Sequence, residues 1–362
     1  MIDRMHGGNI QRYVRGKSGS FKNKLIDFSA NINPLGLPSR AKEVILNNIN
    51  TLIHYPEPEA KQLKNALSSF HNISQNNILV GNGSVELIHL IPRALKAGNA
   101  LIITPTFSEY EFAVRQSLAR PIFVKAQEKD GFKIDSAKIK KFIPRVDLIF
   151  LCNPNNPTGL LLPRSDILPW LQACKKYDTV LVIDEVFMDF VEDSQKQTLI
   201  GEALINKQLI ILKSLTKFFA LPGLRVGHLI AHHSLINKIS KLQYPWNINS
   251  LAQAVAHEVI KDEDYVKETK NFILSERAYL VENLKKIRGL KVYPPSSNFI
   301  FCKLEDTHLK SSIKLHQRLL GQGIIIRSCH NFRGLNDNFF RVGIRARKEN
   351  LRLISALKET LR

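Results

Sequence analysis

Short apolar runs alternate with amphipathic stretches over the first two thirds of the chain. The apolar runs have strand length, at 78–80, 100–103, 121–124, 146–152, 180–183 and 208–213. Helical patterns lie before and between them, at 40–50, 59–71, 87–95, 109–118 and 165–176. Strands that are apolar throughout and alternate with helices are typical of a mainly parallel sheet covered by helices on both faces. The pattern therefore predicts an α/β fold.

The pattern changes after residue 230. Helical signals dominate residues 233–286, and shorter segments follow, with strands at 290–293, 298–304, 324–327 and 339–344 and helices at 310–321 and from residue 347. This arrangement predicts a smaller α+β domain. Three parts are expected: an N-terminal arm at 1–38 that contributes to the site and the small domain, a large domain at 39–245, and a small C-terminal domain at 246–362.

Charge narrows the class of partner. The 362 residues carry a net charge of +20, which favours anionic partners such as nucleic acid or a phosphorylated small molecule. The lysines are scattered, however, with no arginine-rich arm and no alternation of aromatic and basic residues. We therefore do not expect nucleic acid to be the main partner.

Cysteine usage and hydropathy indicate a cytoplasmic protein. The four cysteines are far apart and form no C-x-x-C pair, which argues against a disulfide framework or a structural metal site and for a reducing compartment. The first residues, 1–9, contain no apolar segment of the kind found in signal peptides. Because the longest apolar runs have strand length, no membrane span is expected.

Polar motifs follow four of the predicted strands. They lie at 81–85, 153–159, 184–185 and 214–227. In open parallel sheets, ligands bind at the carboxyl ends of the strands. We therefore expect these four motifs to lie close together and to form one site.

One motif contains a candidate nucleophile. Lys217 follows Ser214 and precedes Arg225, and a desolvated lysine is a free amine part of the time. Asp184 is placed to keep a protonated heteroaromatic nitrogen cationic, and the amide of Asn156 can donate to a phenolic oxygen. Each residue also has a plain structural interpretation: a surface lysine, a helix-capping carboxylate and a turn-forming asparagine.

The remaining features suit a phosphate and a planar ring. Glycine allows close approach of the backbone at Gly83, Ser84 and Val85, where the first free N–H groups of a helix attract an anion. Ser214 and Arg225 complete the cradle, and Phe107 either covers the ring face or belongs to the core. Pyridoxal 5'-phosphate (PLP) requires this combination of lysine, aspartate and phosphate site.

The order of these motifs carries a family resemblance. The motifs stand in the order G-N-G-S, N-P-N-N-P-T-G, D-E-V-F, S-L-T-K with P-G-L-R-V-G, and a late R-V-G-I-R. This order resembles the fold-type I PLP enzymes of the class I/II aminotransferase superfamily, over essentially the whole chain. Four further motifs are similar to those of the L-threonine O-phosphate decarboxylases of cobamide biosynthesis, more than to those of histidinol-phosphate aminotransferases. They are H-G-G-N at 6–9, D-F-S-A-N-I-N-P-L-G at 27–36, W-x-x-N-x-L at 246–251 and I-R-S-C at 326–329.

Phe187 supports the same choice. Superfamily aminotransferases usually have tyrosine at this position, and its hydroxyl bonds the ring oxygen of the cofactor. A phenylalanine cannot donate this bond, and the decarboxylases that the chain resembles tend to have phenylalanine there.

The resemblance implies further roles. His6, Gly7 and Asn31 would help to hold the substrate, and Asn156 would contact both cofactor and substrate. Arg327 and Arg341 would bind the carboxylate and the phosphate of the substrate, in an order left open. Tyr55 would bind the cofactor phosphate of the neighbouring subunit. This role of Tyr55 implies a homodimer with shared active sites. Without the resemblance, structural salt bridges would be the preferred interpretation of the two arginines.

The expected activity is decarboxylation of L-threonine O-3-phosphate, with L-serine O-phosphate left open, to an aminoalkyl phosphate and CO₂. The alternative is histidinol-phosphate aminotransferase, and a remoter one is a basic nucleic-acid-binding or regulatory protein on a PLP fold. The bond of the substrate Cα that lies perpendicular to the cofactor ring decides between decarboxylation and transamination.

Overall fold

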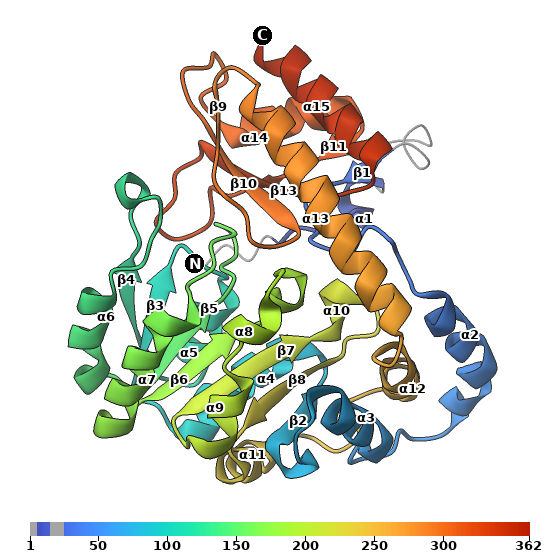
Figure 1. Cartoon of the computed structure of the whole chain (residues 1–362), viewed down its shortest axis with the longest axis vertical. Coiled ribbons are helices and arrows are strands. Elements are labelled where there is room, and N and C mark those ends of the chain that lie inside the picture. Colours follow the sequence, from blue (N-terminus) through green and yellow to red (C-terminus); the bar gives the residue numbers. More distant parts are fainter. Residues whose placement is uncertain (1–5, 15–24) are drawn as a thin grey trace.

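A seven-stranded sheet is the centre of the larger part of the protein in the computed structural model, which describes residues 6–14 and 25–362 (Figure 1). Its strands, in spatial order, are β2 (Ile78–Gly81), β8 (Gly227–Ala231), β7 (Leu209–Ser214), β6 (Val180–Asp184), β5 (Leu148–Cys152), β3 (Asn99–Thr104) and β4 (Arg120–Lys125). Only β8 runs against its neighbours within this sheet. The predicted α/β fold with a mainly parallel sheet is confirmed.

Helices cover both faces of this sheet. The core on one face includes residues of α4 (Gly83–Leu95), α5 (Glu109–Gln116) and α11 (His233–Ser240). The core on the other face includes residues of α6 (Ser136–Phe142), α7 (Arg164–Tyr177) and α9 (Ile200–Ile205). Successive strand residues point to opposite faces, so that Ile210 packs in the first core and Ile211 in the second. Burial on both faces explains why the central residues of these strands are almost all apolar.

The smaller part contains two short sheets. Four antiparallel strands lie in the order β12 (Arg327–Ser328), β13 (Phe339–Gly343), β10 (Phe299–Leu304) and β9 (Leu290–Val292). Strand β1 (Ile26–Asp27) comes from the predicted N-terminal arm and pairs in parallel with β11 (Ile324–Ile325). The amide of Gly343 donates to the carbonyl of Phe28 at 2.7 Å, so this part of the arm also contacts β13.

The remaining helices connect the two parts or flank them. They are α1 (Gln11–Val14), α2 (Ser39–Asn48), α3 (Lys61–His71), α8 (Ser194–Gln197), α10 (Leu215–Phe218), α12 (Ser250–Val259), α13 (Glu263–Lys285), α14 (Ser312–Gly321) and α15 (Arg347–Leu361). Helix α13 runs between the two parts (Figure 1). The domain boundaries at residues 38 and 245 stay predictions, and residues 1–5 and 15–24 of the predicted arm lie outside the described residues.

Several elements differ from the sequence analysis, and helices α6, α8 and α9 were not predicted. Strand β8 was not predicted, and the single strand predicted at 324–327 is divided into β11 and β12, because each half pairs with a different partner. All four cysteines are buried and unpaired. Across the described ranges, no helix combines the length and the apolar character that a membrane crossing requires.

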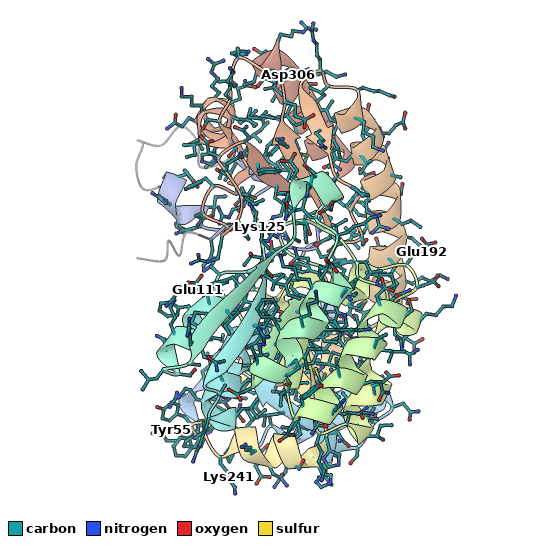
Figure 2. All side chains as sticks on the ribbon, turned by 90° about the vertical axis from the view of Figure 1, so that its left-hand side faces the viewer. Tyr55, Glu111, Lys125, Glu192, Lys241 and Asp306 are labelled. Atoms are coloured by element: carbon teal, nitrogen blue, oxygen red, sulfur yellow. The ribbon has the colours of Figure 1, made fainter. Side chains whose placement is uncertain are left out.

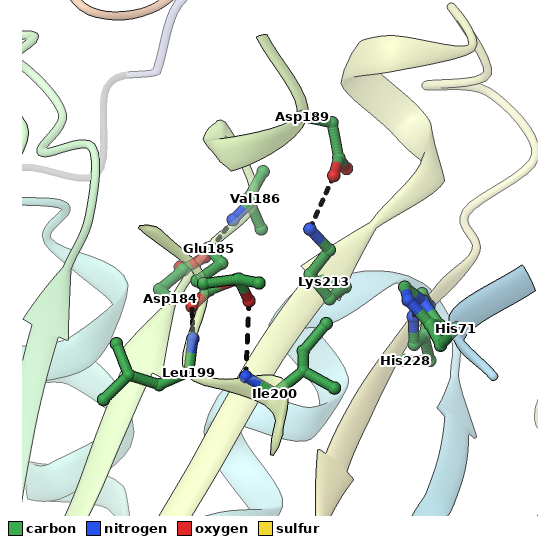
Figure 3. A network of polar contacts seen from close by, with 10 residues as sticks. His71, Asp184, Glu185, Val186, Asp189, Leu199, Ile200, Lys213 and His228 are labelled. Atoms are coloured by element: carbon green, nitrogen blue, oxygen red, sulfur yellow. Dashed lines mark hydrogen bonds and ion pairs between the residues drawn. The ribbon is translucent and has the colours of Figure 1, made fainter. Parts of the chain in front are cut away.

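A buried polar network lies beside the carboxyl end of β7 (Figure 3). The ammonium group of Lys213 donates to the carboxylate of Asp189 at 2.6 Å. Burial alone would lower the pKa of Lys213, but the carboxylates of Asp189 and Glu185 outweigh it and raise this pKa. Lys213 is therefore a structural cation.

Two imidazoles adjoin this network. The Nε2 atoms of His71 and His228 are 2.9 Å apart (Figure 3). Burial, with the nearby charge of Lys213, lowers the pKa of His71 to about 4, and burial also lowers the pKa of His228 well below its usual value. Both rings are thus neutral at pH 7 in the folded protein.

This pair makes stability depend on pH. Between about pH 6.5 and 4 the unfolded chain binds a proton at His71 that the folded chain does not bind, so the free energy of unfolding decreases as the pH falls through this window. The shifted pKa of His71 alone makes the free energy of unfolding roughly 3 kcal/mol larger above pH 6.5 than below pH 4. In urea titrations across this window, we expect a shallower pH dependence for His71→Gln and an unchanged one for the exposed control His308→Gln. Equal slopes for all three proteins would refute this assignment.

Candidate active site

One cavity of about 490 Å³ brings most of the predicted site residues together. It lies at the carboxyl ends of the parallel strands and extends to residues of the smaller part. The predicted residues that line it are His6, Gly7, Asn31, Ser84, Val85, Phe107, Asn156, Asp184, Ser214, Lys217, Arg225, Arg327 and Arg341. Gly83 lies directly behind this lining, and Tyr55 lies elsewhere.

Lys217 lies in α10, directly after β7. The hydroxyl of Ser214 accepts a hydrogen bond from the amide of Thr216 at 3.2 Å and so caps this short helix. Burial lowers the pKa of Lys217 to about 8, and the positive charges of Arg341 and Arg225 act in the same direction. The amine is therefore free at mildly alkaline pH and able to attack a carbonyl carbon.

Asp184 ends β6 and is held by two donors. Its carboxylate accepts from the amide of Val186 at 3.0 Å and from the hydroxyl of Tyr110 at 2.6 Å (the first contact is drawn in Figure 3). Burial raises the pKa of Asp184, and these two hydrogen bonds oppose the rise. They thereby favour the ionised form that a cationic ring nitrogen requires.

Sequence analysis did not identify Tyr110. This residue is fully buried on α5, lines the cavity, and stacks on Phe150 with 5.0 Å between ring centroids. The available signal was its place in the first turn of a helix that follows a strand, three residues after Phe107. Its contact with Asp184 joins segments 74 residues apart and is not visible in local pattern.

Close packing surrounds Gly83, where the sequence predicts an anion site. Gly83 begins α4 with φ at +73°, and a Cβ atom added there would lie 2.4 Å from Nη2 of Arg225. A Cβ at Gly227 would lie 2.6 Å from the amide nitrogen of Ser84. Any side chain at either glycine would displace the guanidinium group or the first turn of α4. The helix N-terminus, this guanidinium group and the Ser214 hydroxyl together suit a phosphate.

Two buried arginines face each other across neighbouring strands. Arg327 on β12 and Arg341 on β13 are directly paired in the sheet. Burial lowers the pKa of Arg341 to about 10. Its guanidinium group donates to neutral acceptors, the side-chain oxygen of Asn156 and the carbonyl of Ser29. Both arginines line the cavity, where their positive charges suit an anionic ligand.

Asn156 and Phe187, for which ring contacts are predicted, both line the cavity. Because the oxygen of the Asn156 side chain accepts from Arg341, its NH₂ group is the end that can donate to a ring oxygen. Phe187 is buried, lines the cavity and packs edge-on against Phe299 at 5.0 Å. The side-chain oxygen of Asn31 is buried and has no hydrogen-bond partner among the described residues, which leaves it available to a ligand donor.

Tyr55 lies on the surface of the larger part (Figure 2). It is 81% exposed and packs against Trp246 with 4.9 Å between ring centroids. Its predicted role concerns the cofactor of a neighbouring subunit, so it stays a prediction.

Comparison with known proteins identifies the family of this chain and the proteins whose fold it shares. The family model for aminotransferase class I and II matches residues 23–357. A threonine-phosphate decarboxylase of Salmonella typhimurium is 35% identical over 100% of this chain and 98% of its own length. The solved histidinol-phosphate aminotransferase of Clostridium acetobutylicum has a TM-score of 0.87 and 34% identity, covering 93% of this chain and 99% of that one.

A solved L-threonine-O-3-phosphate decarboxylase from Porphyromonas gingivalis has a TM-score of 0.82 and 27% identity, covering 92% of this chain and 98% of that one. These likenesses confirm the predicted fold-type I architecture. They also support PLP as the cofactor, which the cavity residues fit. Lys217 would hold the aldehyde, Asp184 the ring nitrogen, and the first turn of α4 with Arg225 the phosphate.

Two lysines near the carboxyl end of β7 allow a direct test of reactivity. Because the pKa of Lys217 is about 8 and that of Lys213 is raised, only Lys217 is expected to react with the PLP aldehyde near neutral pH. The attachment rate should rise with pH up to about 8 and then level off. Borohydride reduction followed by peptide mass spectrometry should find the label on Lys217. Label on Lys213, or a rate independent of pH, would contradict this.

Tyr110 is expected to matter for cofactor affinity. In Tyr110→Phe the carboxylate of Asp184 loses one donor, its pKa rises further, and it holds a cationic ring nitrogen less well. Losing a hydrogen bond to a charged group should weaken PLP binding by about tenfold or more, measured by equilibrium dialysis. The half-exposed Tyr177, changed to Phe, is the control and should bind PLP normally. Unchanged affinity in Tyr110→Phe would argue against this role.

Proposed function

Because the chain belongs to the aminotransferase class I and II family, we propose that it is a PLP-dependent decarboxylase of an O-phosphorylated hydroxy-amino acid. The substrate we propose is L-threonine O-3-phosphate, with L-serine O-phosphate as the variant lacking one methyl group. The products are CO₂ and an aminoalkyl phosphate for cobamide biosynthesis. A methyl pocket discriminates such substrates by roughly 1–3 kcal/mol.

The pair of Arg327 and Arg341 is the observation that carries this proposal. Both guanidinium groups are buried, lie in register and line the same cavity as Lys217. Threonine phosphate has two anionic groups, a carboxylate and a phosphate, whereas histidinol phosphate has only the phosphate. Two adjacent cations therefore suit threonine phosphate better than histidinol phosphate, although they would also suit the two carboxylates of 2-oxoglutarate, the second substrate of the alternative. The order in which the arginines take the two groups stays open.

Different side chains of the cavity would bind the substrate, orient it and transfer the proton. PLP, when bound, draws electrons from the Cα bond that lies perpendicular to its ring. An arginine that holds the carboxylate in this direction favours loss of CO₂, and Lys217 is placed to return a proton to Cα. His6, Gly7 and Asn31 would enclose the substrate. Phe187, which lacks a hydroxyl, leaves the contact with the ring oxygen to Asn156.

Histidinol-phosphate aminotransferase is the second candidate. The close likeness to the solved enzyme of that name favours it. It would require 2-oxoglutarate for turnover. A purely nucleic-acid-binding or regulatory role is not proposed, because it would leave the arrangement of Lys217, Asp184 and Arg225 without a use.

We further propose a homodimer with shared active sites in a reducing cytoplasm. Large apolar side chains are exposed on α2, the turn after it and the segment before α12: Leu46, Leu52, Ile53, Tyr55, Tyr244 and Trp246. Exposed apolar residues of this size are typical of a protein interface. A second copy covering them would allow Tyr55 to reach the neighbouring site.

The experiment measures CO₂ release from L-threonine phosphate and, separately, from L-serine phosphate, with PLP and no keto acid. We expect release that disappears in Lys217→Ala, and a rate ratio that identifies the substrate. Arg341→Gln should lower kcat/KM by a hundredfold or more, because it removes a buried charged partner of the substrate. Amino transfer from histidinol phosphate to 2-oxoglutarate without CO₂ release would refute the decarboxylase and support the second candidate.

A further inference from the structure

Glu109 is a buried carboxylate that the proposed chemistry does not use. It begins α5, has 3% of its surface exposed, and lies between two imidazoles. Its two oxygens lie 2.9 Å from Nε2 of His6 and 3.3 Å from Nε2 of His89 on α4. A buried carboxylate is costly unless it is partnered, so these contacts are strongly favoured in the folded protein.

The segment that carries His6 is held on its other side by the smaller part. The amide of Gly8 donates to the hydroxyl of Ser29 at 2.9 Å. A Cβ atom on Gly7 would lie 2.2 Å from the carbonyl oxygen of Ser29, so only glycine allows this approach. The same carbonyl accepts from Arg341 at 2.9 Å. Residues 6–8 therefore bridge Ser29 in the smaller part and Glu109 in the larger part.

The bridge lies over the cavity. His6 and Phe107 both line it, and their ring centroids are 5.4 Å apart. The His6 side chain is 41% exposed, so its position depends on these few contacts. Because Nε2 of His6 donates a hydrogen bond to the carboxylate of Glu109, the other ring nitrogen of His6 is the one left to a ligand.

We propose that Glu109 is a positioning residue, which fixes the segment of residues 6–8 across the cavity through His6 and so increases the affinity for the phosphorylated substrate. The part that concerns the substrate rests on the proposed function. The part that concerns the attachment of residues 6–8 rests on geometry alone, and the two parts are tested by different measurements.

The attachment is tested in the PLP-loaded protein by hydrogen exchange of the backbone amides of residues 7–14. In Glu109→Gln these amides should exchange faster, by about tenfold, because the charged acceptor of His6 is lost. His89→Gln is the matched control, since it removes the other imidazole contact of Glu109 and leaves the His6 contact in place. Its exchange should equal that of the wild type. PLP absorbance and the unfolding temperature establish that each variant is folded.

His6→Ala tests the same contact from the exposed side, where folding is not at risk. It should accelerate exchange to the same extent as Glu109→Gln, and the double variant should add nothing further. Unchanged exchange in Glu109→Gln, or additive effects in the double variant, would overturn the inference whatever the substrate is.

The substrate part is tested by steady-state kinetics with L-threonine phosphate. Glu109→Gln should raise KM by about tenfold and change kcat by less than about twofold, whereas a merely structural defect would lower kcat and PLP affinity. Faster exchange with an unchanged KM would overturn the role in substrate affinity. If the wild type releases no CO₂ from either phosphorylated amino acid, the proposed function fails alone, and the exchange data still decide the role of Glu109.

Discussion

Burial of the main sheet on both faces is the constraint on which the rest of the structure depends. A strand covered by helices on both sides has no room for unpartnered polar groups, so ligand-binding side chains gather where the parallel strands end. Asp184 ends β6, and Lys217 follows β7 by three residues. The few charged groups within the covered region, such as Lys213 and Glu185, are partnered by carboxylate, hydroxyl or amide groups.

Most of the site follows from this rule and was therefore predictable. The apolar runs predicted most of the strands, and the motifs after them contain residues that the structure brings into one cavity, among them Ser84, Asp184 and Lys217. Features that depend on contacts between distant segments were not predictable. Tyr110 and Glu109 are adjacent in sequence, yet one contacts Asp184 and the other His6, and no local period indicates either contact. The split of residues 324–327 likewise depends on which strands lie beside each half.

Positive charge is concentrated in the cavity by the same architecture. Arg327 and Arg341 come from the smaller part, whereas Lys217 and Arg225 come from the larger part. Their mutual repulsion contributes to the free amine of Lys217, since Arg341 and Arg225 both lower its pKa. An anionic ligand would relieve the repulsion. If Lys217 holds the cofactor and Arg341 the substrate, as we propose, then cofactor attachment and substrate binding are electrostatically coupled.

The pairing of β1 with β11 limits how the chain can be recombined with its relatives. The amides of Ile26 and Phe28 donate to the carbonyls of Gly323 and Ile325, both at 2.8 Å, and Gly343 packs so closely on the arm that an added Cβ would lie 2.6 Å from the carbonyl oxygen of Ala30. This N-terminal segment and residues 323–343 therefore form one structural unit, although 298 positions separate Ile26 from its partner Ile324. A chimaera that exchanges one end between two homologues must carry the other end with it. The same contacts constrain natural sequence change: substitutions in residues 26–30 are expected to be tolerated only where they suit residues 323–343.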